Sequence, residues 1–173
     1  MPRPRPRKTI SHGTKSRRAA ARRRALKTHA ENQIDDFLRQ VGIKDPSECT
    51  SPQGWRELQY DSAEGFAFVQ DEDGNVTFRV IAQIMPLPSD KELIVPLMRD
   101  LLEYNSLLLG ASRFSIDGGS VYASAGQLVE SIKDEAYADY INGVLIMAHT
   151  FTDDLMKWYG GTSRKRAARS VRR

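Results

Sequence analysis

The sequence predicts an α+β domain: an antiparallel sheet of about five strands, helices on one face of it, and basic, disordered tails at both ends. Three observations predict this. Two pairs of short segments with strand-like patterning are each joined by residues typical of tight turns. Three other segments carry apolar residues at helical spacing. Both ends of the chain are basic, whereas its centre is acidic. The predicted order is helix, three strands, helix, two strands, helix, and helices that cover one face of such a sheet make an α+β fold.

Charge is distributed very unevenly over the 173 residues. Residues 1–27 contain 11 Lys and Arg and no acid, and residues 163–173 contain 6 more, again with no acid. The central segment, 28–162, has 9 basic residues against all 22 acidic ones, a formal charge of −13. We therefore expect a basic, largely disordered arm (1–27), an acidic α+β domain (28–162) and a basic tail (163–173). The acidic domain is not expected to bind nucleic acid through a general basic surface.

The first helix has two possible starts. Proline at every second position predicts disorder over residues 1–15, whereas residues 16–27 consist mostly of the strong helix formers Ala, Arg, Leu and Lys. Thr28 and Glu31 fit a capping box, so a helix can begin there, or it can run on continuously from the basic arm. Gly42 is a suitable residue to end this helix at its C-terminus, because Gly readily adopts the left-handed conformation that ends many helices. The apolar positions at helical spacing are Ile34, Phe37, Leu38 and Val41.

Three strands follow a loop over residues 44–54. They are expected at about 55–60, 65–70 and 76–85, where apolar residues alternate along the chain. Residues 71–75, Asp-Glu-Asp-Gly-Asn, predict a hairpin because Gly and Asn accept the positive φ of tight turns. Pro86 and Pro88 end the third strand.

The second half is predicted to hold a helix, two strands and a last long helix. Ser89 and Glu92 form a capping box for a helix over about 90–108, which Pro96 is expected to kink or to shorten at its start. Strands at 113–117 and 120–124 flank Asp117-Gly118-Gly119 and form a second hairpin; whether a strand continues through 127–132 is left open. The last helix, about 133–159, has apolar residues at three- and four-residue steps and ends before Gly160-Gly161.

The segment at residues 101–116, LLEYNSLLLGASRFSI, resembles the type III secretion chaperone-like superfamily, and its YbjN-type bacterial branch in particular. A leucine-rich helix ends in an Asn-x-x-Leu segment, then come a Gly, an Arg-Phe strand, a hairpin and a long C-terminal helix. The resemblance covers about residues 30–159. It implies a small acidic protein, usually a homodimer, that binds other polypeptides and has no catalytic residues. The two basic tails are not part of that pattern.

The residue types needed for catalysis do not come together in the sequence. It has no phosphate-binding Gly-rich loop and no Gly-x-Ser-x-Gly elbow. His149 and Asp153 have the spacing of two metal ligands on a helix, but an exposed polar pair is the better interpretation. We therefore expect no enzyme, no metal and no cofactor. Cys49, the single cysteine, has no neighbouring base and fits a reducing, cytoplasmic location. No apolar run is long enough for a membrane span.

One functional hypothesis is a chaperone-like or adaptor module that binds another polypeptide and forms a homodimer through the second helix and neighbouring strands. That helix offers more apolar surface than one small sheet needs, although its stripe is also explained as the core of a monomer. The residues predicted for a dimer or peptide interface are Leu93, Leu97, Leu101, Tyr104 and Leu108.

The alternative hypothesis is a nucleic-acid-associated protein that grips phosphates through its basic ends. Arg supplies 8 of the 11 cations of the arm, and Arg binds phosphate with two parallel hydrogen bonds. DNA and RNA are not distinguished, and solubility tails or tails folded over the acidic body are further interpretations. An anionic membrane is disfavoured because neither tail has an apolar face. The predicted polyanion-binding residues are Arg3, Arg5, Arg7, Arg17, Arg18, Arg22, Arg23, Arg24, Arg164, Lys165 and Arg166.

Overall fold

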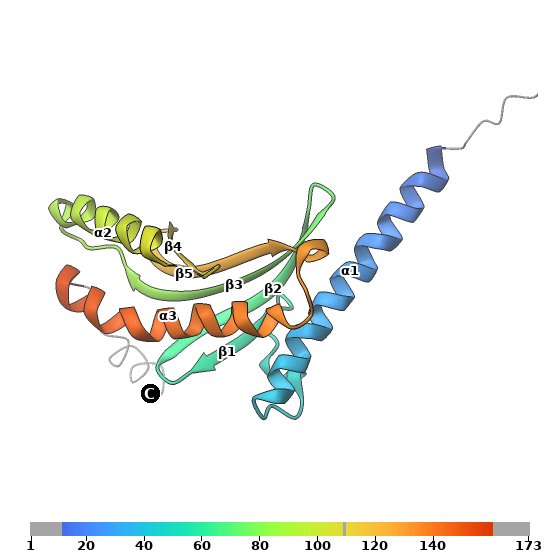
Figure 1. Ribbon diagram of the computed structural model, residues 1–173, viewed down its shortest axis with the longest axis horizontal. Coiled ribbons are helices and arrows are strands. Elements are labelled where there is room, and N and C mark those ends of the chain that lie inside the picture. Colours follow the sequence, from blue (N-terminus) through green and yellow to red (C-terminus); the bar gives the residue numbers. More distant parts are fainter. Residues whose placement is uncertain (1–11, 109, 161–173) are drawn as a thin grey trace, which may run out of the picture.

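The computed structural model describes residues 12–108 and 110–160, and it confirms the predicted α+β fold with its order of helices and strands (Figure 1). The five strands form one antiparallel sheet. They are β1 (Arg56–Tyr60), β2 (Ala63–Glu72), β3 (Asn75–Pro86), β4 (Arg113–Asp117) and β5 (Ser120–Leu128), in the spatial order β1-β2-β3-β5-β4. The α-helices are α1 (His12–Gln40), α2 (Ile94–Leu107) and α3 (Ala136–Tyr159), with three short 3₁₀ helices, η1 (Pro46–Cys49), η2 (Lys91–Leu93) and η3 (Val129–Ser131).

Helix α1 follows the second of its two predicted starts, the one continuous with the basic arm, and it replaces the disorder expected for residues 12–27. It is one continuous helix of 29 residues from His12 to Gln40, so the basic segment is helical from residue 12 onward and the predicted boundary at residue 27 falls inside the helix. Two interactions relieve the repulsion between its cations: Arg22 pairs with Glu130 at 2.9 Å, and Arg23 pairs with Asp71 at 3.2 Å. The helix formers in this segment then suffice to continue the helix. Residues 1–11 and 161–173, which carry the other predicted tail contacts, lie outside the described residues.

Tight turns fix the register of the sheet. In the β2–β3 hairpin, Glu72 lies opposite Asn75, and the turn between them places Asp73 at φ 51° and Gly74 at φ 86°. Positive φ at both central positions is typical of the turns that match the twist of a hairpin. The long strands β3 and β5 pair through the middle of the sheet, with one irregularity between Gln83 and Met85.

One face of the sheet is covered by α3, which runs across β2, β3 and β5 (Figure 1). Alternate residues of β3 are buried against it, as period-two alternation requires. Phe78 and Tyr137 pack edge to face with ring centroids 4.8 Å apart. The buried β3 residues of this face are Val76, Phe78, Val80, Ala82 and Ile84. On the opposite face of the sheet, Trp55 stacks on Phe68 with ring centroids 4.5 Å apart.

Helix α2 packs at the β4 end of the sheet. It begins at Ile94 after η2, so Pro96 lies in its first turn, where a proline costs no helical hydrogen bond. The Tyr104 ring contacts Phe114 of β4 and Phe151 of α3, with centroids 5.9 Å and 5.1 Å apart. Because α2 begins only at Ile94, Pro96 has the second of its two predicted effects, which is to shorten the helix at its start.

Among the described residues, no helix has the length and apolar character that a membrane span requires.

Candidate protein-binding surfaces

A groove runs beside the free edge of β1. This strand pairs with β2 alone, and on its other side only Arg56 forms an isolated bridge, to Thr50. From Glu57 to Tyr60 the edge has no strand partner within the described part of the chain. The groove next to it has a volume of about 710 Å³. An unpaired strand edge is a template for pairing with another chain, so this surface is suited to an extended peptide.

The walls of the groove are mostly apolar and come from four parts of the chain. They comprise the end of α1 and the turn after it, η1, the strands β1 and β2, and α3. The apolar lining residues are Phe37, Leu38, Val41, Ile43, Cys49, Leu58, Tyr60, Phe66 and Leu145. Val41 and Tyr60 keep 59% and 44% of their surface exposed, which is high for large apolar side chains. Among the described residues, Glu57 and Glu64 are the only charged ones that line the groove, so this part of the chain gives it apolar walls and a negative rim.

A half-buried ion pair holds α1 in place beside this groove. The Arg56 guanidinium of β1 donates to both carboxylate oxygens of Asp35, from Nε at 2.6 Å and from Nη2 at 3.3 Å. The side chains are only 16% and 19% exposed. The hydrogen bond to Asp35 raises the pKa of Arg56 above its already high ordinary value, so the guanidinium stays protonated. Helix α1 is thereby fixed against the strand that offers its edge.

Two of the five apolar residues predicted for the interface at α2 belong to the chain's own core, and the other three pack against it. Leu97 and Leu101 are 0% and 4% exposed, and Leu93, Tyr104 and Leu108 are half-buried against the same core. These five residues therefore lie on the side of the helix region that packs inward. The structure supports the monomer-core interpretation for Leu97 and Leu101, which leave almost no surface for a partner.

A different apolar stripe on α2 faces outward. Val95, Met98 and Leu102 follow one another at steps of three and four residues and are 72%, 44% and 70% exposed. Met98 and Leu102 border a shallow groove of about 240 Å³, whose other wall includes Phe114 and Ile116 of β4. This stripe and groove, here called the α2–β4 surface, offer an apolar face next to an edge strand.

Asn105 closes part of the β4 edge. Its side-chain Nδ2 donates to the Phe114 carbonyl at 3.0 Å, and the Phe114 N–H donates to Asn105 Oδ1 at 2.7 Å. The amide thus makes the two hydrogen bonds that a neighbouring strand would make at this residue. Side chains of α2, more than main-chain groups of β4, are left to form contacts at this end of the sheet.

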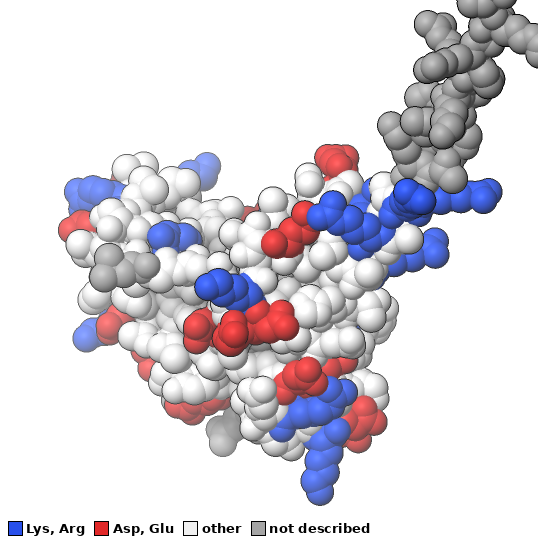
Figure 2. All heavy atoms as spheres, turned by 45° about the vertical axis from the view of Figure 1, so that its right-hand side comes forward, with Lys and Arg blue, Asp and Glu red and all other residues white. Residues whose placement is uncertain are grey.

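The predicted polyanion-binding residues that the structure describes all lie on α1. Arg17, Arg18, Arg22 and Arg24 are exposed, although Arg22 also pairs with Glu130. Arg23 is half-buried and faces the body. Figure 2 shows blue Lys and Arg side chains where α1 leaves the body, with red Asp and Glu side chains beside them. Arg3, Arg5, Arg7, Arg164, Lys165 and Arg166 lie outside the described residues.

The structure places His149 away from any metal-binding arrangement. Its Nε2 lies 3.5 Å from Asp61, and its Nδ1 lies 3.1 Å from the Ser62 hydroxyl. Over residues 12–108 and 110–160, three or more His, Cys, Asp or Glu side chains nowhere gather closely enough to hold a metal ion.

Solved structures are similar to this chain, whereas no family model and no curated protein sequence matches it. The structure of the ExsC-ExsE complex matches 74% of this chain and 94% of that chain, with a TM-score of 0.54 and 16% identity. The structure of the HopA1-SchA chaperone-effector complex matches 70% and 91%, with a TM-score of 0.51 and 15% identity. The fold is that of the type III secretion chaperones.

The resemblance predicted from residues 101–116 is confirmed at the level of this fold. YbjN from E. coli is also matched, over 70% of this chain and 88% of that chain, but its TM-score of 0.42 and 12% identity are too low to decide the branch. The groove beside β1 was missed at the sequence level, because its walls come from segments more than 100 residues apart, from Phe37 to Leu145. The one local indication of this groove was Val41, the last residue of the apolar stripe of the first helix, which is exposed in the structure.

Proposed function

We propose that this protein is a non-enzymatic, chaperone-like binding module that holds an extended segment of another polypeptide along the free edge of β1. The observation that carries the proposal is the unpaired strand edge with an apolar groove directly beside it. The fold supports it, because two structures with this fold are complexes with another protein, ExsC with ExsE and SchA with the effector HopA1. The single cysteine of the chain favours the cytoplasm as its location.

We also propose a chemistry for the ligand from the residues that line the groove. Main-chain groups of the peptide pair with β1, which gives affinity without reading sequence. Alternate side chains of an extended peptide point the same way, so apolar residues at every second position enter the groove. Glu57 and Glu64 then favour Lys or Arg at the intervening positions.

Cys49 provides a direct test, because it lines the groove, is half-buried and is the only cysteine of the chain. A synthetic peptide of alternating Val and Lys is expected to slow alkylation of Cys49 by a thiol reagent in the full chain. The same peptide with N-methyl groups on alternate amides is expected to protect much less, because it cannot pair with a strand. Equal protection by both peptides, or no protection by either, contradicts the proposal.

Two exposed valines give a matched pair of variants. Val41→Asp places a charge in the groove, whereas Val95→Asp places one on the α2–β4 surface. Neither side chain is buried, so both variants are expected to fold with stabilities within about 0.5 kcal/mol of the parent. Only Val41→Asp is expected to abolish protection of Cys49. Equal binding by the two variants would place the peptide elsewhere.

We further propose that the protein is a homodimer and that the α2–β4 surface is the contact. Variants of Leu101 and Leu102 distinguish a dimer contact at the α2–β4 surface from a purely structural role in the core, because Leu101 is 4% exposed and Leu102 is 70% exposed. Leu101→Asp buries a charge without a partner and is expected to unfold the domain. Leu102→Asp is expected to fold normally and to halve the mass measured by light scattering at about 10⁻⁵ M, a modest affinity by the usual scale. A parent protein that is already monomeric at that concentration contradicts the dimer.

The basic ends belong to the same proposal. We expect them to bind a polyanionic partner, because clustered arginines without acids neutralise phosphates in a salt-sensitive and sequence-independent manner. The body itself, with its formal charge of −13, repels such a partner. The peptide groove and the polyanion-binding segment thus serve different ligands at opposite ends of α1.

A further inference from the structure

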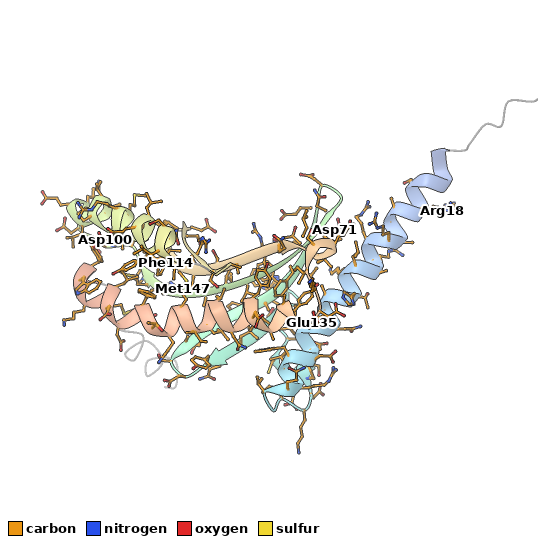
Figure 3. All side chains as sticks on the ribbon, in the orientation of Figure 1. Arg18, Asp71, Asp100, Phe114, Glu135 and Met147 are labelled. Carbon is orange, nitrogen blue, oxygen red and sulfur yellow. The ribbon has the colours of Figure 1, made fainter. Side chains whose placement is uncertain are left out.

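The basic half of α1 extends away from the body, as Figure 1 shows, and Figure 3 labels Arg18 on this projecting part. Four of its arginines, Arg17, Arg18, Arg22 and Arg24, are exposed. A polyanion can therefore reach these arginines from the side of the helix that faces away from the body, while Glu130 and Asp71 lie beside the helix where it leaves the body.

These four arginines form two separate faces of the helix. At about 100° per residue, Arg17 and Arg24 lie within about 20° of each other around the axis, and Arg18 and Arg22 within about 40°. The two pairs are about 130° apart by the same count.

The body-facing side of the helix lies opposite both faces. Arg23, which pairs with Asp71, and Ala30 and Ile34, which are buried, share that side. The direction midway between the two arginine pairs is about 180° from it. The two cationic faces thus lie on either side of the line along the helix that points directly away from the body.

This arrangement distinguishes between the possible polyanions. A flat anionic surface, such as a membrane, contacts one face of a helix at a time. Between residues 16 and 27 the only large apolar side chain is Leu26, which packs against the core, so this segment has nothing to insert into lipid. A groove with phosphates on both walls contacts both faces at once. The major groove of B-form DNA admits an α-helix, whereas the deep, narrow major groove of duplex RNA does not.

We propose, building on the polyanion part of the proposed function, that this segment of α1 lies in the major groove of duplex DNA. Arg17 and Arg24 contact the phosphates of one strand, and Arg18 and Arg22 those of the other. Arg22 is suited to this role despite its ion pair, since its side chain remains 70% exposed. Arg23 is held against Asp71 and keeps the helix oriented on the body.

The test is a titration of the full chain with a DNA duplex of about 20 base pairs at salt concentrations from about 50 to 200 mM. Two double variants each remove one face: Arg17→Gln with Arg24→Gln, and Arg18→Gln with Arg22→Gln. Glutamine is a good helix former, so helicity is retained. Each variant is expected to flatten the slope of log affinity against log salt by about 1.8, from two lost phosphate contacts. A control with Arg79→Gln and Arg113→Gln, exposed arginines of the sheet, is expected to leave the slope unchanged.

Three results overturn the proposal. If only one double variant changes the slope, the ligand contacts a flat face. If neither changes it, any DNA binding runs through other parts of the chain. If duplex RNA or vesicles of anionic phospholipid bind as tightly as DNA, the groove argument fails. Protection of Cys49 by the peptide, measured on the same variants, is expected to be unchanged, so a failure of the peptide groove and a failure of DNA binding are told apart.

Discussion

Gly65 is the position where one added methyl group tests the packing of the sheet most sharply. It lies in β2 opposite Ala82, beneath α3. A Cβ at this position would lie 2.6 Å from the backbone oxygen of Ile81, 3.2 Å from the Ala82 Cβ and 3.3 Å from a terminal methyl of Leu145. The first contact is shorter than any normal van der Waals separation and involves the main chain of a central strand. Accommodating Gly65→Ala therefore requires β2 and β3 to move apart locally.

The cost follows from two opposing effects. Overpacking of a well-filled core costs about 1–3 kcal/mol, while replacing Gly by Ala returns about 0.4–1 kcal/mol by restricting the unfolded chain. We expect Gly65→Ala to lower the free energy of unfolding by about 1–2 kcal/mol, which lowers the melting temperature by roughly 2–8 °C in a domain of this size.

Gly126 of β5 is the matched control. An added Cβ there meets the Arg79 Cγ at 3.4 Å and the Phe78 carbonyl oxygen at 3.5 Å, which are ordinary contacts. Gly126→Ala is expected to be neutral or to stabilise by up to about 1 kcal/mol. Urea unfolding followed by circular dichroism measures both variants. Equal stabilities for Gly65→Ala and Gly126→Ala would refute the packing of α3 and the β2–β3 register described above.

Two further predictions concern buried polar groups. Asp35→Ala leaves the Arg56 charge half-buried without its partner and is expected to lower the free energy of unfolding in urea by about 2 kcal/mol. Asp36→Ala breaks an exposed pair and is expected to lower it by less than about 0.5 kcal/mol. Similar losses of free energy in the two variants would contradict the assigned burial. Burial raises the pKa of Tyr137 and of Tyr159 to about 12 in the folded protein, above the ordinary value near 10. The unfolded chain therefore loses these protons first, and stability is expected to fall between about pH 10 and 12 by about 1.4 kcal/mol per pH unit for each tyrosine. Tyr137→Phe is expected to remove half of this slope at little cost near pH 7, because its buried hydroxyl has no hydrogen-bond partner within the described residues; an unchanged slope would contradict the assigned burial.

Local chemistry explains the parts of the fold that could be predicted from the sequence. Both long hairpins were placed correctly, because Asp73-Gly74 and Gly118-Gly119 supply the positive φ that their turns adopt. The start and the end of α3 were predicted within a few residues, since Gly160 ends it in a left-handed conformation. These features depend on a few neighbouring residues, which the sequence displays directly.

Contacts between distant segments explain what was not predicted. The arm is helical from His12 partly because Arg22 and Arg23 find acids in η3 and β2, and no local pattern announces such pairs. On α2, the apolar residues cover much more than one face, so periodicity does not distinguish the buried Leu101 from the exposed Leu102. Only the positions of β4 and α3 decide which side faces inward.

The amide of Asn105 has a consequence for how copies of this protein can assemble. An edge strand with free main-chain groups can add further strands without limit, which is the route to fibrous aggregates. At β4 that route is obstructed at Phe114, because Asn105 already occupies both of its main-chain groups. Contacts through the side chains of α2 are of a different kind: when two copies use the same patch, the patch is consumed and growth stops at two. Asn105 thus favours finite association over open-ended polymerisation at this end of the sheet.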